Sequence, residues 1–370
     1  EIMPSLVGSE MCIRDRIKID KNMQFAIIRL KTKPLHKGEL TLTRRTKSWV
    51  AVLLFIAVFG ALLVTATFTD LQVSHILTAK ALAAHTYYTN ETTYGVVLEA
   101  VGSSPVYLML AFSFQILFWQ VMRKMKKHPW KEILAILLLV AGTAAYFVMF
   151  DDAVKYALQH IGPEAELFRK AAFLRGISMF FAGLMTFFAT FAIRNYSEES
   201  VGKLVMFAVA VLCVAAVSNG IIAAVKEPVG RMRYRAMNCE GGAAIGGFDN
   251  FTRWYVVNGQ HIPKEEMKAL FGTTDALKSF PSGHTCSAGT VYCLLMLLDV
   301  FAVKSKGKRA VCWIAAIAYT GMVAVSRIIV GAHFFSDVLM GGTIAFVCMI
   351  ISREIFICKG ANVKAMFGKE

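Results

Sequence analysis

Apolar residues along this chain gather in long blocks that are separated by short polar stretches. The first block, WVAVLLFIAVFGALLVTATF, runs from Trp49 to Phe68 without a charged residue. A helix of about this length crosses the roughly 30 Å hydrocarbon core of a bilayer. Further apolar blocks begin near Ser104, Lys131, Ala171, Leu204, His284, Ala310 and His333. The pattern predicts an all-α fold, a polytopic transmembrane helix bundle of about eight spans.

Composition favours a membrane protein over a soluble one. Hydrophobic residues make up 56% of the chain, which is above the roughly 45 to 50% that is typical of soluble domains. The formal net charge of +15 would suggest nucleic-acid binding in a soluble protein. Here the basic residues lie beside the apolar blocks, so we expect a lipid bilayer and no nucleic acid as the partner.

The distribution of charge predicts how the chain crosses the membrane. Lysine and arginine crowd the segment before the first block, and they recur in the stretches RKMKKHPWK and KSKGKR. Short loops rich in these residues stay on the cytoplasmic side. We therefore expect a multi-pass protein of the cell membrane with both termini in the cytoplasm. The long connector from about Lys226 to Phe280 and the turn from Arg327 to His333 would then be extracytoplasmic.

Three polar clusters interrupt the carboxy-terminal half at predicted outer ends of spans: KEPVGRMRY, PSGH and SRIIVGAHFFSD. Alone, each has an ordinary explanation, since basic residues at a span end reach for lipid headgroups and a Pro-Ser-Gly run often starts a helix. The predicted topology brings all three to one side of the membrane. Three cations, two histidines and a carboxylate together suit phosphoryl transfer, in which cations offset charge on the phosphoryl oxygens.

Spacing within the third cluster suggests roles for its residues. His333 and Asp337 are four apart, so they would share one face of a helix. The carboxylate could then accept the ring N–H of the histidine and leave the other ring nitrogen as a nucleophile. Arg327 would offer a forked pair of donors to two phosphate oxygens.

The second cluster suggests an anion site at a helix start. Gly283 allows close approach of the backbone to a ligand, and Ser282 with the first amides of the helix can bind a phosphate. His284 is then the candidate general acid.

The three clusters resemble the motifs of the type 2 phosphatidic acid phosphatase superfamily, K-x6-R-P, P-S-G-H and S-R-x5-H-x3-D. Lys226 and Arg233 fill the first motif, Pro281 to His284 the second, and Ser326 to Asp337 the third. The resemblance implies a six-helix phosphatase core that needs no metal or other cofactor. It also implies that His333 forms a phosphohistidine, that His284 is the acid, and that the phosphate is held by three residues, Lys226, Arg233 and Arg327.

The chain departs from the motif pattern at one position. Tyr234 replaces the proline of the first motif, and a proline would fix the backbone beside Arg233. Arg231 and Arg235 lie nearby, so the sequence leaves open which arginine binds phosphate.

The sequence pattern and the resemblance together give an expected division of the chain. Residues 1–16 resemble a translated sequencing adaptor and are expected to be non-native, and residues 17–48 form a basic cytoplasmic tail. Residues 49–165 hold the amino-terminal spans and a surface helix, 166–355 the phosphatase core, and 356–370 a second cytoplasmic tail. The spans between Ser104 and Phe150 are expected to be additions to the six-helix core.

The favoured hypothesis is a phosphatase that hydrolyses a membrane lipid phosphate or diphosphate, such as a polyprenyl diphosphate, phosphatidylglycerol phosphate or phosphatidate. A lipid phosphotransferase would share the first half of the reaction. The sequence also leaves open an anion transporter and a metal site at His333 and Asp337, although the neighbouring cations would repel a metal ion. It makes no prediction of the oligomeric state.

Overall fold

The computed structural model describes residues 44–78, 87, 92–159 and 172–367. The expected non-native segment, residues 1–16, lies outside the described residues, as do most of the basic tail and the last three residues of the chain. The remainder from Arg44 onward groups as one unit.

Seven of the described helices are long and apolar enough to cross a membrane. These helices are α2 (Arg44–Thr78), α4 (Ser104–Lys124), α5 (Pro129–Gln159), α7 (Ala172–Arg194), α8 (Glu198–Val229), α14 (Lys306–Ile329) and α15 (Phe335–Ser352). No strand occurs in the described part of the chain, and the predicted all-α polytopic bundle is confirmed.

The block expected to begin near His284 is helical but broken into three consecutive pieces. They are α12 (Gly283–Gly289), the 3-10 helix η2 (Thr290–Cys293) and α13 (Leu294–Val300). These pieces pack against α8, α14 and α15. This block is therefore not among the seven long helices, although the sequence predicted a span there and about eight spans in all.

Short helices lie at the ends of the long ones. α3 (Thr93–Val101) directly precedes α4, and α9 (Tyr234–Met237), α10 (Glu240–Ala243), η1 (Gly247–Asn250) and α11 (Lys264–Phe271) follow α8. A π-helical turn, η3 (Arg353–Ile357), and α16 (Ala361–Met366) follow α15.

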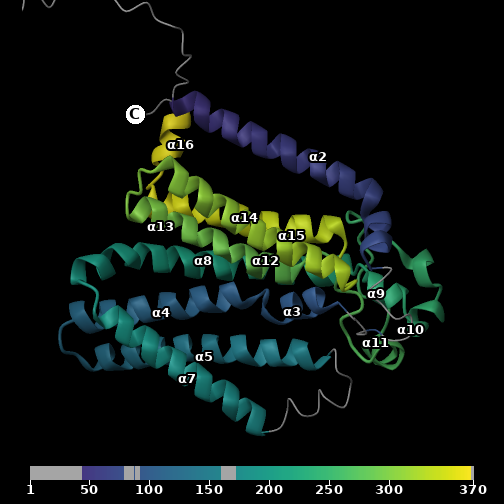
Figure 1. Cartoon of the computed structure of the whole chain (residues 1–370), viewed down its shortest axis with the longest axis horizontal. Helices are drawn as coiled ribbons and strands as arrows, with labels where there is room; N and C mark the ends of the chain where they lie inside the picture. Colours follow the sequence, from purple (N-terminus) through teal and green to yellow (C-terminus); the bar gives the residue numbers. More distant parts are fainter. Residues whose placement is uncertain (1–43, 79–86, 88–91, 160–171, 368–370) are drawn as a thin grey trace, which may run out of the picture. The chain divides into compact units, whose positions relative to one another are not determined.

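The long helices pack side by side (Figure 1). α4 lies between α5 and α8, α15 packs between α8 and α2, and α7 crosses the face of α5. The largest buried apolar cluster includes Ile116 of α4, Val211 of α8, Met296 of α13 and Met349 of α15. Helices α2, α5 and α7 expose large apolar side chains such as Phe187, which suits contact with lipid.

The end of α8 shows how the sequence sets up the polar end of the bundle. α8 begins after Ser197, whose hydroxyl accepts a hydrogen bond from the Ser200 amide over 3.2 Å. It ends at Gly230, which has φ +57°. A Cβ at Gly230 would lie 1.6 Å from the carbonyl oxygen of Gly259, so only glycine fits this turn. The turn leads the chain directly into the arginines of the first motif.

Candidate active site

Backbone hydrogen bonds join the three motifs at one end of the bundle. The Arg235 amide donates to the Gly331 carbonyl over 2.8 Å, which connects the first motif region to the third. The Ser282 amide donates to the Asp337 carbonyl over 3.0 Å, which connects the second motif to the third. Segments that are far apart in the chain thus form one site.

A polar cavity of about 120 Å³ lies where the motifs meet. Five of the predicted site residues line it, and the other three, Ser282, Gly283 and Asp337, do not. The lining residues are Lys155, Tyr156, Gln159, Lys226, Arg233, Arg235, Asp275, Lys278, His284, Arg327 and His333.

His333 lies in the turn between α14 and α15, and its side chain is buried. Its Nδ1 lies 2.5 Å from the carbonyl oxygen of Ser279. Since a carbonyl can only accept, Nδ1 carries the proton, and Nε2 is left with its lone pair. The tautomer is therefore the one expected for a nucleophile, although the acceptor is a backbone carbonyl and not the Asp337 carboxylate.

Asp337 acts on His333 through Ser279. Its Oδ2 lies 3.8 Å from His333 Nδ1, which is too long for a hydrogen bond. The same oxygen accepts from the Ser279 hydroxyl over 2.5 Å and from the Phe334 amide over 2.8 Å. Asp337 thus fixes Ser279, and Ser279 fixes the imidazole.

The surroundings of His333 keep its ring neutral. Burial lowers the pKa of His333 to about 3, and the nearby positive charges of Arg233 and Arg327 act in the same direction, while Asp337 opposes them. At neutral pH the ring is therefore uncharged and its lone pair is available.

The structure separates the arginines of the first motif by role. Arg231 is fully buried and donates to Asp337 Oδ1 over 2.6 Å and to Asp70 Oδ2 of α2 over 3.0 Å. Its Nε donates to the Thr252 carbonyl over 2.8 Å. Arg231 therefore joins α2 to the site, and it does not line the cavity. Arg233 does line it.

Tyr234, in place of the motif proline, is buried in an aromatic cluster. Its hydroxyl lies 2.8 Å from His75 Nδ1 of α2, and its ring packs against Phe248 and Phe334. The neighbouring Arg233 amide donates to the Ala276 carbonyl over 2.8 Å. Packing and hydrogen bonding hold the backbone here, where a proline would restrict φ.

Arg327 is held by a residue that the sequence analysis missed. Its Nη2 donates to Glu99 Oε1 of α3 over 2.8 Å, and Glu99 is fully buried. Arg235 Nη1 lies 3.6 Å from the same oxygen. Glu99 stands among apolar residues just before a predicted span, and an ionisable residue in such a place is a signal of function.

Several buried side-chain nitrogens at the cavity find no hydrogen-bond partner in the part of the chain that the structure describes. Among the described residues, none accepts a hydrogen bond from Arg327 Nε or Nη1 or from Arg233 Nε, and none pairs with His284 Nε2. Leaving such groups unpaired costs about 1 to 3 kcal/mol each. Their convergence on one cavity indicates that a polar, anionic ligand completes the site.

The second motif forms the start of α12. Ser282 is buried, and its hydroxyl accepts a hydrogen bond from the Thr285 amide over 3.3 Å, so the side chain serves as the helix cap. A Cβ at Gly283 would lie 3.3 Å from Lys226 Nζ, which places the ammonium group directly over this glycine. The His284 ring lies edge-on to Tyr156, with ring centroids 4.7 Å apart.

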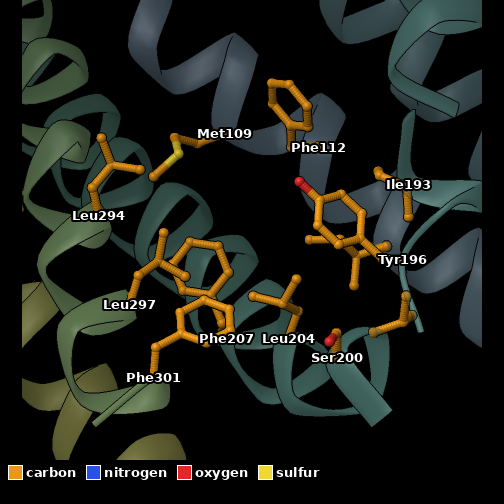
Figure 2. A pocket seen from close by; sticks show the side chains of 12 residues that line it. Met109, Phe112, Ile193, Tyr196, Ser200, Leu204, Phe207, Leu294, Leu297 and Phe301 are labelled. Atoms are coloured by element: carbon orange, nitrogen blue, oxygen red, sulfur yellow. The ribbon is translucent and has the colours of Figure 1, made fainter. Parts of the chain in front are cut away.

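A larger cavity of about 340 Å³ lies elsewhere between α4, α8 and α13. Figure 2 shows apolar side chains such as Met109, Phe112, Leu297 and Phe301 around it. No motif residue lines it. This apolar cavity is therefore not the candidate active site.

The hypothesis of a metal site requires the Asp337 carboxylate to bind the metal ion together with His333. Both of its oxygens accept hydrogen bonds from protein donors. In the part of the chain that the structure describes, no three His, Cys, Asp or Glu side chains group as metal ligands would.

Comparison with known proteins gives one match. Residues 239–357 match the family model described as the PAP2 superfamily. This range contains the second and third motifs, whereas Lys226 and Arg233 precede it. No curated protein and no solved structure matches the chain.

Proposed function

Since residues 239–357 match the model of the PAP2 superfamily, we propose that the chain is a member of that superfamily and an integral membrane phosphatase acting on a lipid phosphate or diphosphate. The family supports hydrolysis of a phosphoric ester in general. The lipid substrate, the phosphohistidine intermediate and the extracytoplasmic site are our proposals.

The unpartnered donors around His333 carry this proposal. Arg327 and Arg233 present buried N–H groups to the cavity, and Lys226 Nζ lies over Gly283. These cations would bind the phosphoryl oxygens and offset the charge that develops on them during transfer. The neutral His333 ring beside them supplies a nucleophile.

The first half of the reaction forms a phosphohistidine. Nε2 of His333 attacks phosphorus, and the bond from phosphorus to the leaving oxygen breaks. The electron pair stays on that oxygen, which takes a proton from His284, whose protonated form is favoured once the negative charge of the bound phosphate offsets the surrounding cations. The Ser279 carbonyl keeps the Nδ1 proton of His333 in place, and the nearby Asp337 carboxylate offsets the positive charge on the phosphorylated ring.

The second half releases phosphate. Water attacks the phosphohistidine, the bond from Nε2 to phosphorus breaks, and the water proton passes to His284. His333 returns to its neutral form, and the phosphate leaves from the cations that held it.

The position of the cavity supports a lipid substrate. It lies at one end of the bundle, where α5, α8 and α14 end and α15 begins. A headgroup could reach His333 there while its hydrocarbon tail stays in the bilayer. The positive loops near the other ends of the helices favour an extracytoplasmic location for this end.

The proposal is tested by phosphate release from a panel of lipid phosphates in detergent. The purified protein should release phosphate from at least one of phosphatidate, phosphatidylglycerol phosphate and a polyprenyl diphosphate. The His333→Gln variant should release it at least about a thousandfold more slowly, because the covalent route is lost. Equal rates for the two proteins would contradict the mechanism.

A further inference from the structure

The cavity carries more positive charge than the three motifs account for. Of the eleven described residues that line it, six are lysine or arginine and one, Asp275, is acidic. Lys226, Arg233 and Arg327 belong to the motifs. The additional cations are Lys155, Arg235 and Lys278.

Arg235 lies near a carboxylate, whereas Lys155 lies near an aromatic ring. Arg235 Nη1 lies 3.6 Å from the buried Glu99 carboxylate, so its charge is partly offset within the protein. Lys155 lies near the end of α5, and its Nζ sits 5.1 Å from the centre of the Tyr156 ring. An aromatic face attracts a cation without cancelling its charge.

Lys155 lies on the side of the cavity where the leaving group would be. The Tyr156 ring, which Lys155 contacts, packs edge-on against His284, the proposed acid. The leaving oxygen must lie beside the acid that protonates it. A charged leaving group would therefore be close to Tyr156 and Lys155.

Lys278 stands at the rim of the same cavity. Its ammonium group is 3.6 Å from Glu227 and 3.8 Å from Asp275, and its side chain is 27% exposed. Asp275 experiences the charges of Arg233, Lys278 and Lys155, which lower its pKa although burial acts in the opposite direction. Two carboxylates, Asp275 in the cavity and Glu227 outside its lining, thus lie near three cations, and net positive charge remains in the cavity.

We propose that Lys155 and Lys278 form a second phosphate subsite and that the preferred substrate is a lipid diphosphate. This inference rests on the proposed function. The terminal phosphoryl group would lie at Lys226, Arg233 and Arg327, and the phosphoryl group next to the lipid would lie at the second subsite. Lys155 comes from α5, a helix outside the matched residues 239–357.

The reaction at a diphosphate then follows the same course with a charged leaving group. Nε2 of His333 attacks the terminal phosphorus, and the bond from that phosphorus to the bridging oxygen breaks. The electron pair stays on the bridging oxygen, which becomes part of a lipid monophosphate. Lys155 and Lys278 offset the negative charge of this product as it forms.

The experiment compares farnesyl diphosphate with farnesyl monophosphate, which share one lipid tail. Lys155→Ala should lower kcat/KM for the diphosphate about tenfold or more, because a charge-assisted contact is lost. Its effect on the monophosphate should stay within about threefold. Lys278→Ala, at the more exposed rim, should show the same selectivity. Lys264→Ala, a change to an exposed lysine of α11, is the matched control and should alter neither substrate.

The outcomes separate the inference from the proposed function. Equal losses for the two substrates in Lys155→Ala and Lys278→Ala, or no loss in either variant, would overturn the second subsite and leave a phosphatase. A wild-type protein that releases phosphate from neither farnesyl compound nor from any other lipid phosphate would contradict the proposed function itself.

Discussion

Arg327 of α14 donates a 2.8 Å hydrogen bond to the buried carboxylate of Glu99 in α3. This contact joins the third motif to a helix that lies outside the matched residues 239–357. It uses Nη2 of the guanidinium, and Nε and Nη1 find no protein partner among the described residues. Glu99 therefore sets the direction in which Arg327 presents its remaining donors.

Glu99→Gln should lower kcat/KM about tenfold or more, mainly through a higher KM. The amide keeps an acceptor oxygen but removes the negative charge that both guanidinium groups approach, so Arg327 and Arg235 lose their common counterion. The measurement is steady-state phosphate release over a range of substrate concentrations. Glu132→Gln, at an exposed position of α5, is the control and should behave like the wild type. An unchanged KM in Glu99→Gln would argue against this positioning role.

Arg231→Ala should mainly lower the stability of the protein, whereas Arg233→Ala should mainly weaken substrate binding. Arg231 pairs with two buried carboxylates, so its loss should lower the free energy of unfolding by about 3 to 5 kcal/mol. Arg233 lines the cavity, and within the described residues its side chain donates one long hydrogen bond, over 3.4 Å, to the Lys278 carbonyl. Arg233→Ala should therefore keep most of the stability and raise KM. Thermal unfolding in detergent, with kinetics on the folded variants, distinguishes the two; the reverse pattern would show that their roles are exchanged.

Acid should destabilise the protein in part through His333. Its pKa is about 3 in the folded protein and about 6.5 when unfolded, so the unfolded chain binds an extra proton between these values. The contribution of His333 to the free energy of unfolding is fully present above pH 6.5. It falls by about 1.4 kcal/mol for each pH unit between pH 6.5 and pH 3. The loss of Tm between pH 7.5 and 4.5 should be smaller in His333→Gln than in the wild type.

His261→Gln is the control for this titration, since His261 is exposed. It should follow the wild type at every pH. Parallel curves for His333→Gln and the wild type would show that His333 titrates normally in the folded protein.

The sequence predicted the bundle and the residues of the three motifs, because both depend on local patterns. A long apolar block can be recognised as a membrane span from its own sequence, whichever helices it packs against. The motifs converge because the helices that carry them place those ends at the same end of the bundle. α2 nevertheless runs on to Thr78, beyond the last residue of its apolar block, and this extension carries Asp70 to Arg231.

Contacts between distant segments could not be predicted from spacing. Glu99 and Lys155 come to the site because of how α3 and α5 pack against the other helices. The sequence does not show which side of each of these helices faces the site. The predicted direct contact of His333 with Asp337 assumed a common helix. Because α15 begins only at Phe335, His333 lies in the preceding turn, and Ser279 fills the space between the two side chains.

The most direct test of the account is a rapid-quench experiment with a substrate that is radiolabelled in its terminal phosphoryl group. A single turnover should transfer label to the protein in a form that survives base and is lost in acid, as expected for phosphohistidine. Digestion should then locate the label on the peptide that contains His333, and His333→Gln should carry none. Label on another residue, or wild-type rates of phosphate release from His333→Gln, would contradict the account.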